Sequence, residues 1–120
     1  MLYYLNNWRN RKHADIYGGS AIYDLWADGV EDKRARSMTR GDICLILSRL
    51  GEHDVTVGRY VFTEAVPGPD DAASGRGVWV LKGTLDDSES LSKVAAAKHP
   101  IYARFFNKLG HVCQWGVLRG

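Results

Sequence analysis

Apolar residues occur along this chain mostly in short runs, a pattern typical of strands. Residues 2–5 form an aromatic run, and residues 43–47 are continuously apolar, as expected when both faces of a strand are buried. Residues 55–62 and 77–85 are two further predicted strands, and residues 111–118 predict a final one. We expect residues 43–47 to form the central strand.

The polar stretches between these runs predict short helices and loops. Residues 32–38 carry apolar positions near the spacing that one buried helix side needs. Residues 91–98 are strongly helical, with Asp86 or Asp87 as the predicted N-cap, and a second short helix is expected through Phe105. The segments predicted to be loops or turns are residues 6–12, 14–23, 25–30 and 67–75.

This order of elements predicts an α+β fold. Mostly consecutive antiparallel strands with few helices favour a small curved mixed sheet or barrel, flanked by short helices, over a βαβ nucleotide-binding fold. A chain of 120 residues is long enough for one core, so we expect a single domain over residues 1–120.

The amino-acid composition indicates which broad class of protein the chain belongs to. The apolar fraction of 45% and the charged fraction of 25% are those of an ordinary globular domain, and no apolar run approaches the ~20 residues that span a bilayer. The apolar N-terminal stretch lacks a preceding basic region, which predicts a strand and not a signal peptide. Cys44 and Cys113 lie in apolar predicted strands, which favours buried free thiols. We therefore expect a cytoplasmic monomer with no membrane partner.

Sequence motifs give little support to catalysis or metal binding. The chain has no P-loop, no Gly-x-Gly-x-x-Gly, no Cys-x-x-Cys and no His-x-x-x-His, and its four histidines are scattered through different segments. We therefore predict no enzyme activity, no metal and no cofactor.

Tryptophan is the residue type that points to a ligand. Three tryptophans lie at or near predicted strand ends, beside glycine, asparagine or basic residues: Trp8, Trp26 and Trp79. Flat aromatic walls close to the amides of Asn6 and Asn7 would suit a planar nucleobase, which needs stacking on its faces and hydrogen bonds on its edge. Core packing accounts for the spacing of the tryptophans equally well.

Basic residues cluster beside two of these tryptophans. The first cluster, near Trp8, comprises Arg9, Arg11 and Lys12, and the second, after Trp26, comprises Lys33, Arg34, Arg36 and Arg40. Both are candidate phosphate ligands. A solvated polar face is the alternative, and Glu31 and Asp32 beside the second cluster support it. The net charge of +2 does not by itself argue for nucleic acid.

A family resemblance rests on the segment Trp26-Ala-Asp-Gly-Val30, followed by Ala35-Arg36-Ser37-Met38-x-x-Gly41-Asp42 and an apolar strand. This segment resembles the early part of EVE domains, which belong to the PUA-like superfamily and are related to YTH domains. Residues 1–7 and 57–61 resemble further strands of that superfamily, and residues 78–81 resemble the segment that supplies a second cage tryptophan in YTH domains. The resemblance covers about residues 1–85.

The resemblance implies a PUA-like curved sheet or barrel that captures a modified nucleobase in an aromatic pocket. Trp26 and Trp79 would be the pocket walls, and Asn6 or Asn7 would contact the base edge. The implied function is a non-enzymatic reader that flips a methylated or hydroxymethylated base of DNA into the pocket. Prokaryotic relatives of this type serve modification-dependent restriction systems, so any cutting would need a fused or separate nuclease.

Two alternatives stay open. An RNA-binding PUA-like module would act on tRNA or ribosomal RNA. A small hydrolase related to ASCH domains would use Lys33 or Arg36, although the Gly-x-Lys-x-x-x-x-Arg signature of that group is missing. A cavity across which Trp26 and Trp79 face each other would favour the reader over the enzyme.

Overall fold

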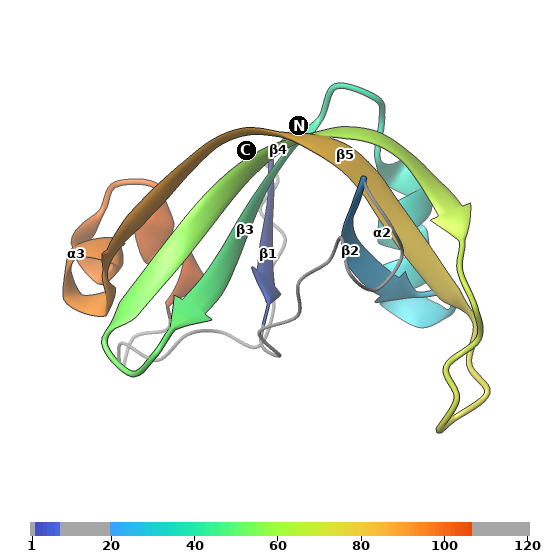
Figure 1. Cartoon of the computed structure of the whole chain (residues 1–120). Coiled ribbons are helices and arrows are strands. Elements are labelled where there is room, and N and C mark those ends of the chain that lie inside the picture. Colours follow the sequence, from blue (N-terminus) through green and yellow to red (C-terminus); the bar gives the residue numbers. More distant parts are fainter. Residues whose placement is uncertain (1, 8–19, 107–120) are drawn as a thin grey trace. The chain divides into compact units, whose positions relative to one another are not determined.

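The computed structural model describes residues 2–7 and 20–106 of the chain (Figure 1). Over these residues the protein is a mixed α+β structure, as predicted, with a five-stranded sheet in the order β1-β3-β4-β5-β2. The strands are β1 (Leu2–Asn7), β2 (Ala21–Trp26), β3 (Ile43–Leu50), β4 (Asp54–Pro67) and β5 (Val78–Ser92). The helices are α2 (Gly29–Ser37), α3 (Lys93–Lys98) and the 3₁₀ helix η1 (Tyr102–Phe105). None of the described helices is both long and apolar enough to cross a membrane.

The described residues divide into two compact units. The first unit contains residues 2–7, 43–60 and 85–106, and the second contains residues 20–42 and 61–84. Strands β4 and β5, which are neighbours in the sheet, each contribute residues to both units. The single domain expected from chain length stays a prediction.

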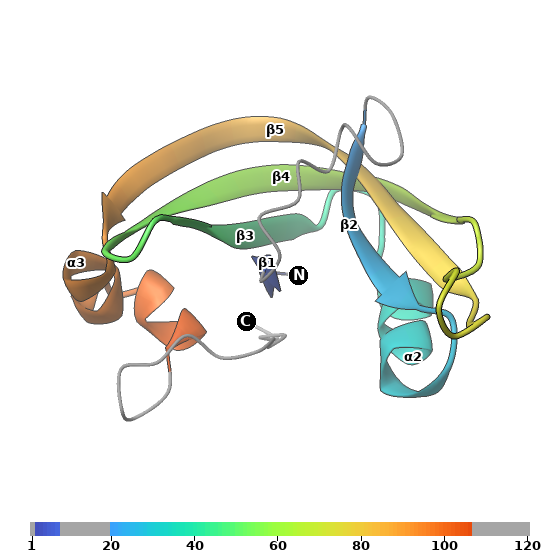
Figure 2. The ribbon, with the colours of Figure 1, turned by 60° about the horizontal axis from the view of Figure 1, so that its bottom comes forward.

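The core of the first unit forms around the parallel pair β1 and β3, which are in register from Leu2 opposite Ile43 to Asn7 opposite Ser48. Residues 44–47 are all buried, which confirms that this apolar run is covered on both faces. Figure 2 shows α3 and η1 next to each other at the end of β5. The buried cluster of this unit is Tyr4, Leu45, Leu47, Val55, Val57, Ala96 and Phe105.

The second unit is built on the antiparallel pair β2 and β5, with α2 following directly after β2 (Figure 2). The register runs from Tyr23 opposite Leu81 to Trp26 opposite Val78, with an irregularity between Ala21 and Tyr23. Its buried apolar side chains are Ala21, Ile22, Leu25, Ala35, Phe62, Val78, Val80 and Leu81. In this unit, α2 and the parts of β4 and β5 between residues 61 and 84 carry the site described below.

Three of the predicted loops and turns, at residues 6–12, 14–23 and 25–30, are partly wrong because strand pairing extends into them. β2 occupies residues that were predicted to be a loop and a turn, since Ile22 and Leu25 are buried in a strand that is hydrogen-bonded to the distant β5. Asn6 and Asn7, predicted to lie in a turn, pair with Leu47 and Ser48 at the end of β1. In both strands, the secondary structure depends on pairing with residues far along the chain, which a local sequence pattern does not reveal.

The strand order also differs from the prediction. β4, and not β3, is the central strand. The parallel pairing of β1 with β3 makes the sheet mixed, as predicted. β5 continues through Asp86 and Asp87, which were predicted to cap a helix. The cap is instead Ser92, whose Oγ accepts a hydrogen bond of 3.1 Å from the backbone N–H of Ala95.

Several local predictions are confirmed. The helix expected at residues 32–38 is α2, which begins a little earlier, and the short helix through Phe105 is η1. The proline-rich segment predicted as a loop joins β4 to β5, and Cys44 is a buried free thiol. The predicted last strand and Cys113 lie outside the described residues.

Candidate functional site

A tight turn after α2 ties the end of this helix to β4. The backbone N–H of Thr39 donates to Oδ2 of Asp42 at 2.7 Å. The N–H of Gly41 donates to the carbonyl of Phe62 at 2.9 Å, and the N–H of Phe62 donates to the carbonyl of Asp42 at 2.8 Å. Gly41 has a φ of +94°, a conformation that glycine adopts without steric cost. The residues of this turn are therefore held at a fixed place beside β4.

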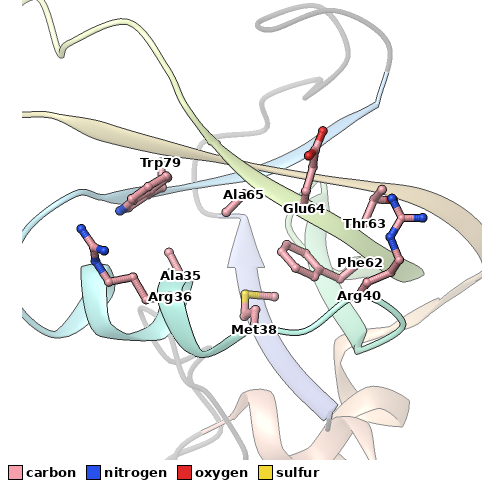
Figure 3. Close-up of a pocket in the computed structure, with 9 residues that line it drawn as sticks. All are labelled: Ala35, Arg36, Met38, Arg40, Phe62, Thr63, Glu64, Ala65 and Trp79. Carbon is pink, nitrogen blue, oxygen red and sulfur yellow. The ribbon is translucent and has the colours of Figure 1, made fainter.

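A cavity of about 310 Å³ lies in the second unit, lined by α2, this turn, β4 and β5 (Figure 3). Its volume is at the lower end of the ~300–1,000 Å³ typical of small-molecule sites. Phe62 is only 3% exposed, whereas Trp79 and Met38 are half-buried. The lining residues are Ala35, Arg36, Met38, Arg40, Phe62, Thr63, Glu64, Ala65 and Trp79.

The carboxylate of Asp32 fixes the orientation of the Trp79 indole. The indole Nε1–H donates to Oδ1 of Asp32 at 2.7 Å, and Nε of Arg36 donates to the two carboxylate oxygens at 3.0 and 3.1 Å. The guanidinium carbon of Arg36 lies 5.6 Å from the indole centroid, within the range of a cation–π contact. We call Asp32, Arg36 and Trp79 the Asp32 clamp.

The clamp keeps Asp32 ionised. The hydrogen bond from the Trp79 indole, followed by the hydrogen bond and positive charge of Arg36, lowers the pKa of Asp32 below its ordinary value of 3.8. At neutral pH the Asp32–Arg36 pair therefore consists of two opposite charges that cancel, and Asp32 remains an acceptor for the indole N–H.

We expect the contribution of the clamp to stability to disappear in acid. A carboxyl whose folded pKa is lowered stabilises the fold above its unfolded pKa of about 3.8, and this contribution is lost as the pH falls through the lower folded value. Denaturant unfolding of the wild type and Asp32→Asn, from about pH 7 to about pH 2.5, measures the difference in the free energy of unfolding. Wild type should be the more stable at pH 7, and its advantage should shrink below about pH 4. An advantage that is constant over this range would contradict the role given to ionised Asp32.

Trp26 lies on the opposite face of the sheet from Trp79. In the antiparallel register Leu25 is opposite Trp79, and Trp26 is opposite Val78. Opposed residues share a face of the sheet, and successive residues alternate between faces. The prediction that the indoles of Trp26 and Trp79 face each other as two walls of one pocket is therefore wrong.

Trp26 instead packs against an ion pair. The guanidinium carbon of Arg76 lies 4.0 Å from the centroid of the Trp26 ring, and Arg76 also donates two hydrogen bonds to Asp28, the one from Nε being 3.2 Å long. This pairing lowers the pKa of Asp28 and raises that of Arg76. The N–H of Ala27 donates to the carbonyl of Gly77 at 2.9 Å. These contacts join the end of β2 to the segment before β5 and give Trp26 a structural role.

The other predicted site residues are placed as follows. On α2, Lys33 is exposed, Arg34 is half-buried, and Arg36 belongs to the Asp32 clamp. Asn6 and Asn7 end β1 in the first unit, and the structure describes their backbone but not their side chains. Trp8, Arg9, Arg11 and Lys12 lie outside the described residues.

Sequence reasoning missed the residue that holds the indole. From the sequence, Asp32 was taken to support a solvated polar face. Its spacing of four residues from Arg36, however, is the spacing at which side chains on a helix form ion pairs. Phe62 was assigned only to a strand, and its place in the pocket depends on the turn that binds its backbone to Gly41 and Asp42. The helix spacing could have indicated Asp32, whereas no local signal indicates Phe62.

The pocket lining suits a planar ligand, and its charged side chains are of both signs because Glu64 lines the pocket together with the two arginines. Phe62 and Met38 provide apolar surface, the Trp79 indole adds a flat ring, and Arg36 and Arg40 supply guanidinium groups. No family model, curated protein or solved structure matches this chain. Over the residues that the structure describes, His, Cys, Asp and Glu side chains form no group of three or more that could hold a metal ion. Binding through stacking and charge is the chemistry that these residues can perform.

Proposed function

We propose that this chain is a nucleic-acid-binding module that recognises a modified base in DNA by taking the flipped base into the pocket of the second unit. The observation that carries this proposal is the Trp79 indole, held by Asp32 in the wall of a cavity of about 310 Å³ that two arginines also line. Stacking of a base on an aromatic side chain contributes roughly 1–3 kcal/mol. Flipping a base out of a duplex costs a few kcal/mol, so contacts inside the pocket have to offset that cost.

The apolar part of the lining supports recognition of a small modification. Phe62, Met38 and Ala65 line the same pocket as the indole. A single methyl group that fills an apolar pocket changes affinity by roughly 10- to 200-fold. A modified base that fits against these side chains would therefore bind more tightly than its unmodified form.

The resemblance of residues 26–42 to EVE domains supports the same proposal and a PUA-like fold, but the facing pair of tryptophans that would favour a reader over an enzyme is not formed. Of the two tryptophans that the resemblance implies as walls, Trp79 lines the pocket, whereas Trp26 lies on the opposite face of the sheet. Cleavage of the marked DNA would fall to a fused or separate nuclease. The hydrolase alternative gains no support from Arg36, because Asp32 binds its guanidinium group.

A binding screen tests the proposed function. Duplexes of one sequence that contain 5-methylcytosine, 5-hydroxymethylcytosine, N6-methyladenine or no modification are titrated with the full chain at one salt concentration, beside their RNA counterparts. We expect one modified DNA duplex to bind at least about tenfold more tightly than the unmodified duplex. Equal affinity for all DNA duplexes would contradict the proposal, and tighter binding of RNA would favour the RNA-binding module.

A further inference from the structure

The two arginines that line the pocket differ in whether their charge is available to a ligand. Arg36 is bound through Nε to both carboxylate oxygens of Asp32, so the charges of the pair cancel. Arg40 is exposed, and it forms no ion pair with any other residue that the structure describes. Glu64, the carboxylate among the lining residues, is not paired with Arg40 within that part of the chain either. Arg40 therefore brings to the pocket a positive charge that no acidic side chain of the described residues pairs with, although the carboxylate of Glu64 also lines the pocket.

The position of Arg40 is fixed by the turn that carries it. Its neighbours Thr39 and Gly41 are hydrogen-bonded to Asp42 and to the backbone of Phe62, at 2.7 and 2.9 Å. A guanidinium group on a backbone that is already ordered loses less conformational entropy when it binds an anion. Figure 3 shows Arg40 beside Thr63 at one end of the lining and Trp79 with Arg36 at the other.

We infer that Arg40 is the phosphate contact of the pocket, so that the pocket binds a nucleotide unit, with the base at Trp79 and the phosphate of that nucleotide at Arg40. This inference rests on the proposed function and adds the substrate class to it. Arginine suits the role because its planar fork donates two parallel hydrogen bonds to phosphate oxygens. Arg36, which sequence analysis grouped with Arg40, would serve the indole and not the phosphate.

The salt dependence of binding tests this assignment. Each protein–phosphate contact in duplex DNA contributes about 0.9 to the slope of log affinity against log salt concentration. We expect Arg40→Gln to reduce this slope by about 1 for the preferred modified duplex of the screen, and to weaken its binding about tenfold. With the unmodified duplex, whose base does not enter the pocket, the slope should not change. Arg40→Lys, which keeps the charge, should restore the slope.

Two further variants separate this effect from a general loss of charge. Arg59→Gln removes the same charge in the first unit, where Arg59 pairs with Asp86 at 3.2 Å, and it should leave the slope unchanged. Arg36→Gln should also leave the slope unchanged, even if it weakens binding. An unchanged slope in Arg40→Gln, or an equal reduction with both duplexes, would overturn the inference while the proposed function stands. If no modified duplex is preferred in the first place, both are overturned.

Discussion

Replacing Trp79 by leucine is expected to remove the preference for a modified duplex, whereas the same change at Trp26 is expected to leave that preference intact. The Trp79 indole is in the pocket lining, and Trp26 belongs to the opposite face of the sheet, against Arg76. Loss of stacking of roughly 1–3 kcal/mol corresponds to about a 5- to 150-fold weaker binding of the modified duplex. Weak, salt-sensitive binding of the unmodified duplex should persist.

The two variants are matched, because each removes one half-buried tryptophan from the paired strands β2 and β5. A difference between them therefore reports on the face of the sheet and not on the loss of a tryptophan in general. Dissociation constants for the modified and unmodified duplexes are measured for each variant, and circular dichroism checks that each is folded. An equal loss of preference in both variants would mean that the indoles act together, against the assigned faces. A preference that survives in Trp79→Leu would exclude the pocket as the base site.

Leu47→Ala is expected to lower the free energy of unfolding by roughly 2–5 kcal/mol. Leu47 has no exposed surface and packs in the core of the first unit, where the smaller side chain would leave a cavity. Leu85→Ala is the matched control, because Leu85 belongs to the same unit but is 57% exposed, and its replacement should change stability by less than about 0.5 kcal/mol. Urea unfolding of both variants gives the two values. Similar values would show that the cluster around Leu47 is not the stabilising core.

Sequence patterns predicted the elements whose character is local. The continuous apolar run of β3 has strand length and is buried on both faces. The polar segment before Gly41 forms α2, and the segment rich in proline and glycine after β4 forms a loop. In each case neighbouring residues carry the signal, so the pattern and the structure agree.

The elements that sequence reasoning missed depend on partners far along the chain. β2 is a strand because β5 pairs with it. β1 continues through the turn-prone Asn6 and Asn7 because these residues pair with β3. Strand register is also what separates Trp26 from Trp79, because a shift of one residue exchanges the faces of a strand. Neither pairing nor register can be read from the spacing of tryptophans.

The candidate site likewise combines residues that local sequence indicates with contacts between residues far apart in the chain. Trp79 was predicted as a ligand-binding residue from its place near a strand end, and it lines the pocket. Its hydrogen bond to Asp32 joins residues 47 positions apart, and the contribution of Phe62 depends on a turn closed by backbone hydrogen bonds. The sequence therefore indicated three lining residues, Trp79, Arg36 and Arg40, but not the apolar and backbone contacts that bring them together.

We propose that the base enters the pocket at Trp79 and not at Trp26, and the indole N–H signals in a nitrogen–proton NMR spectrum test this most directly. Single Trp→Phe variants assign the signals of the two indoles, and the wild type is then titrated with the preferred modified duplex. We predict that the Trp79 signal, from the N–H that is bonded to Asp32, shifts on binding while the Trp26 signal stays in place. A shift of Trp26 with Trp79 unmoved would contradict the claim.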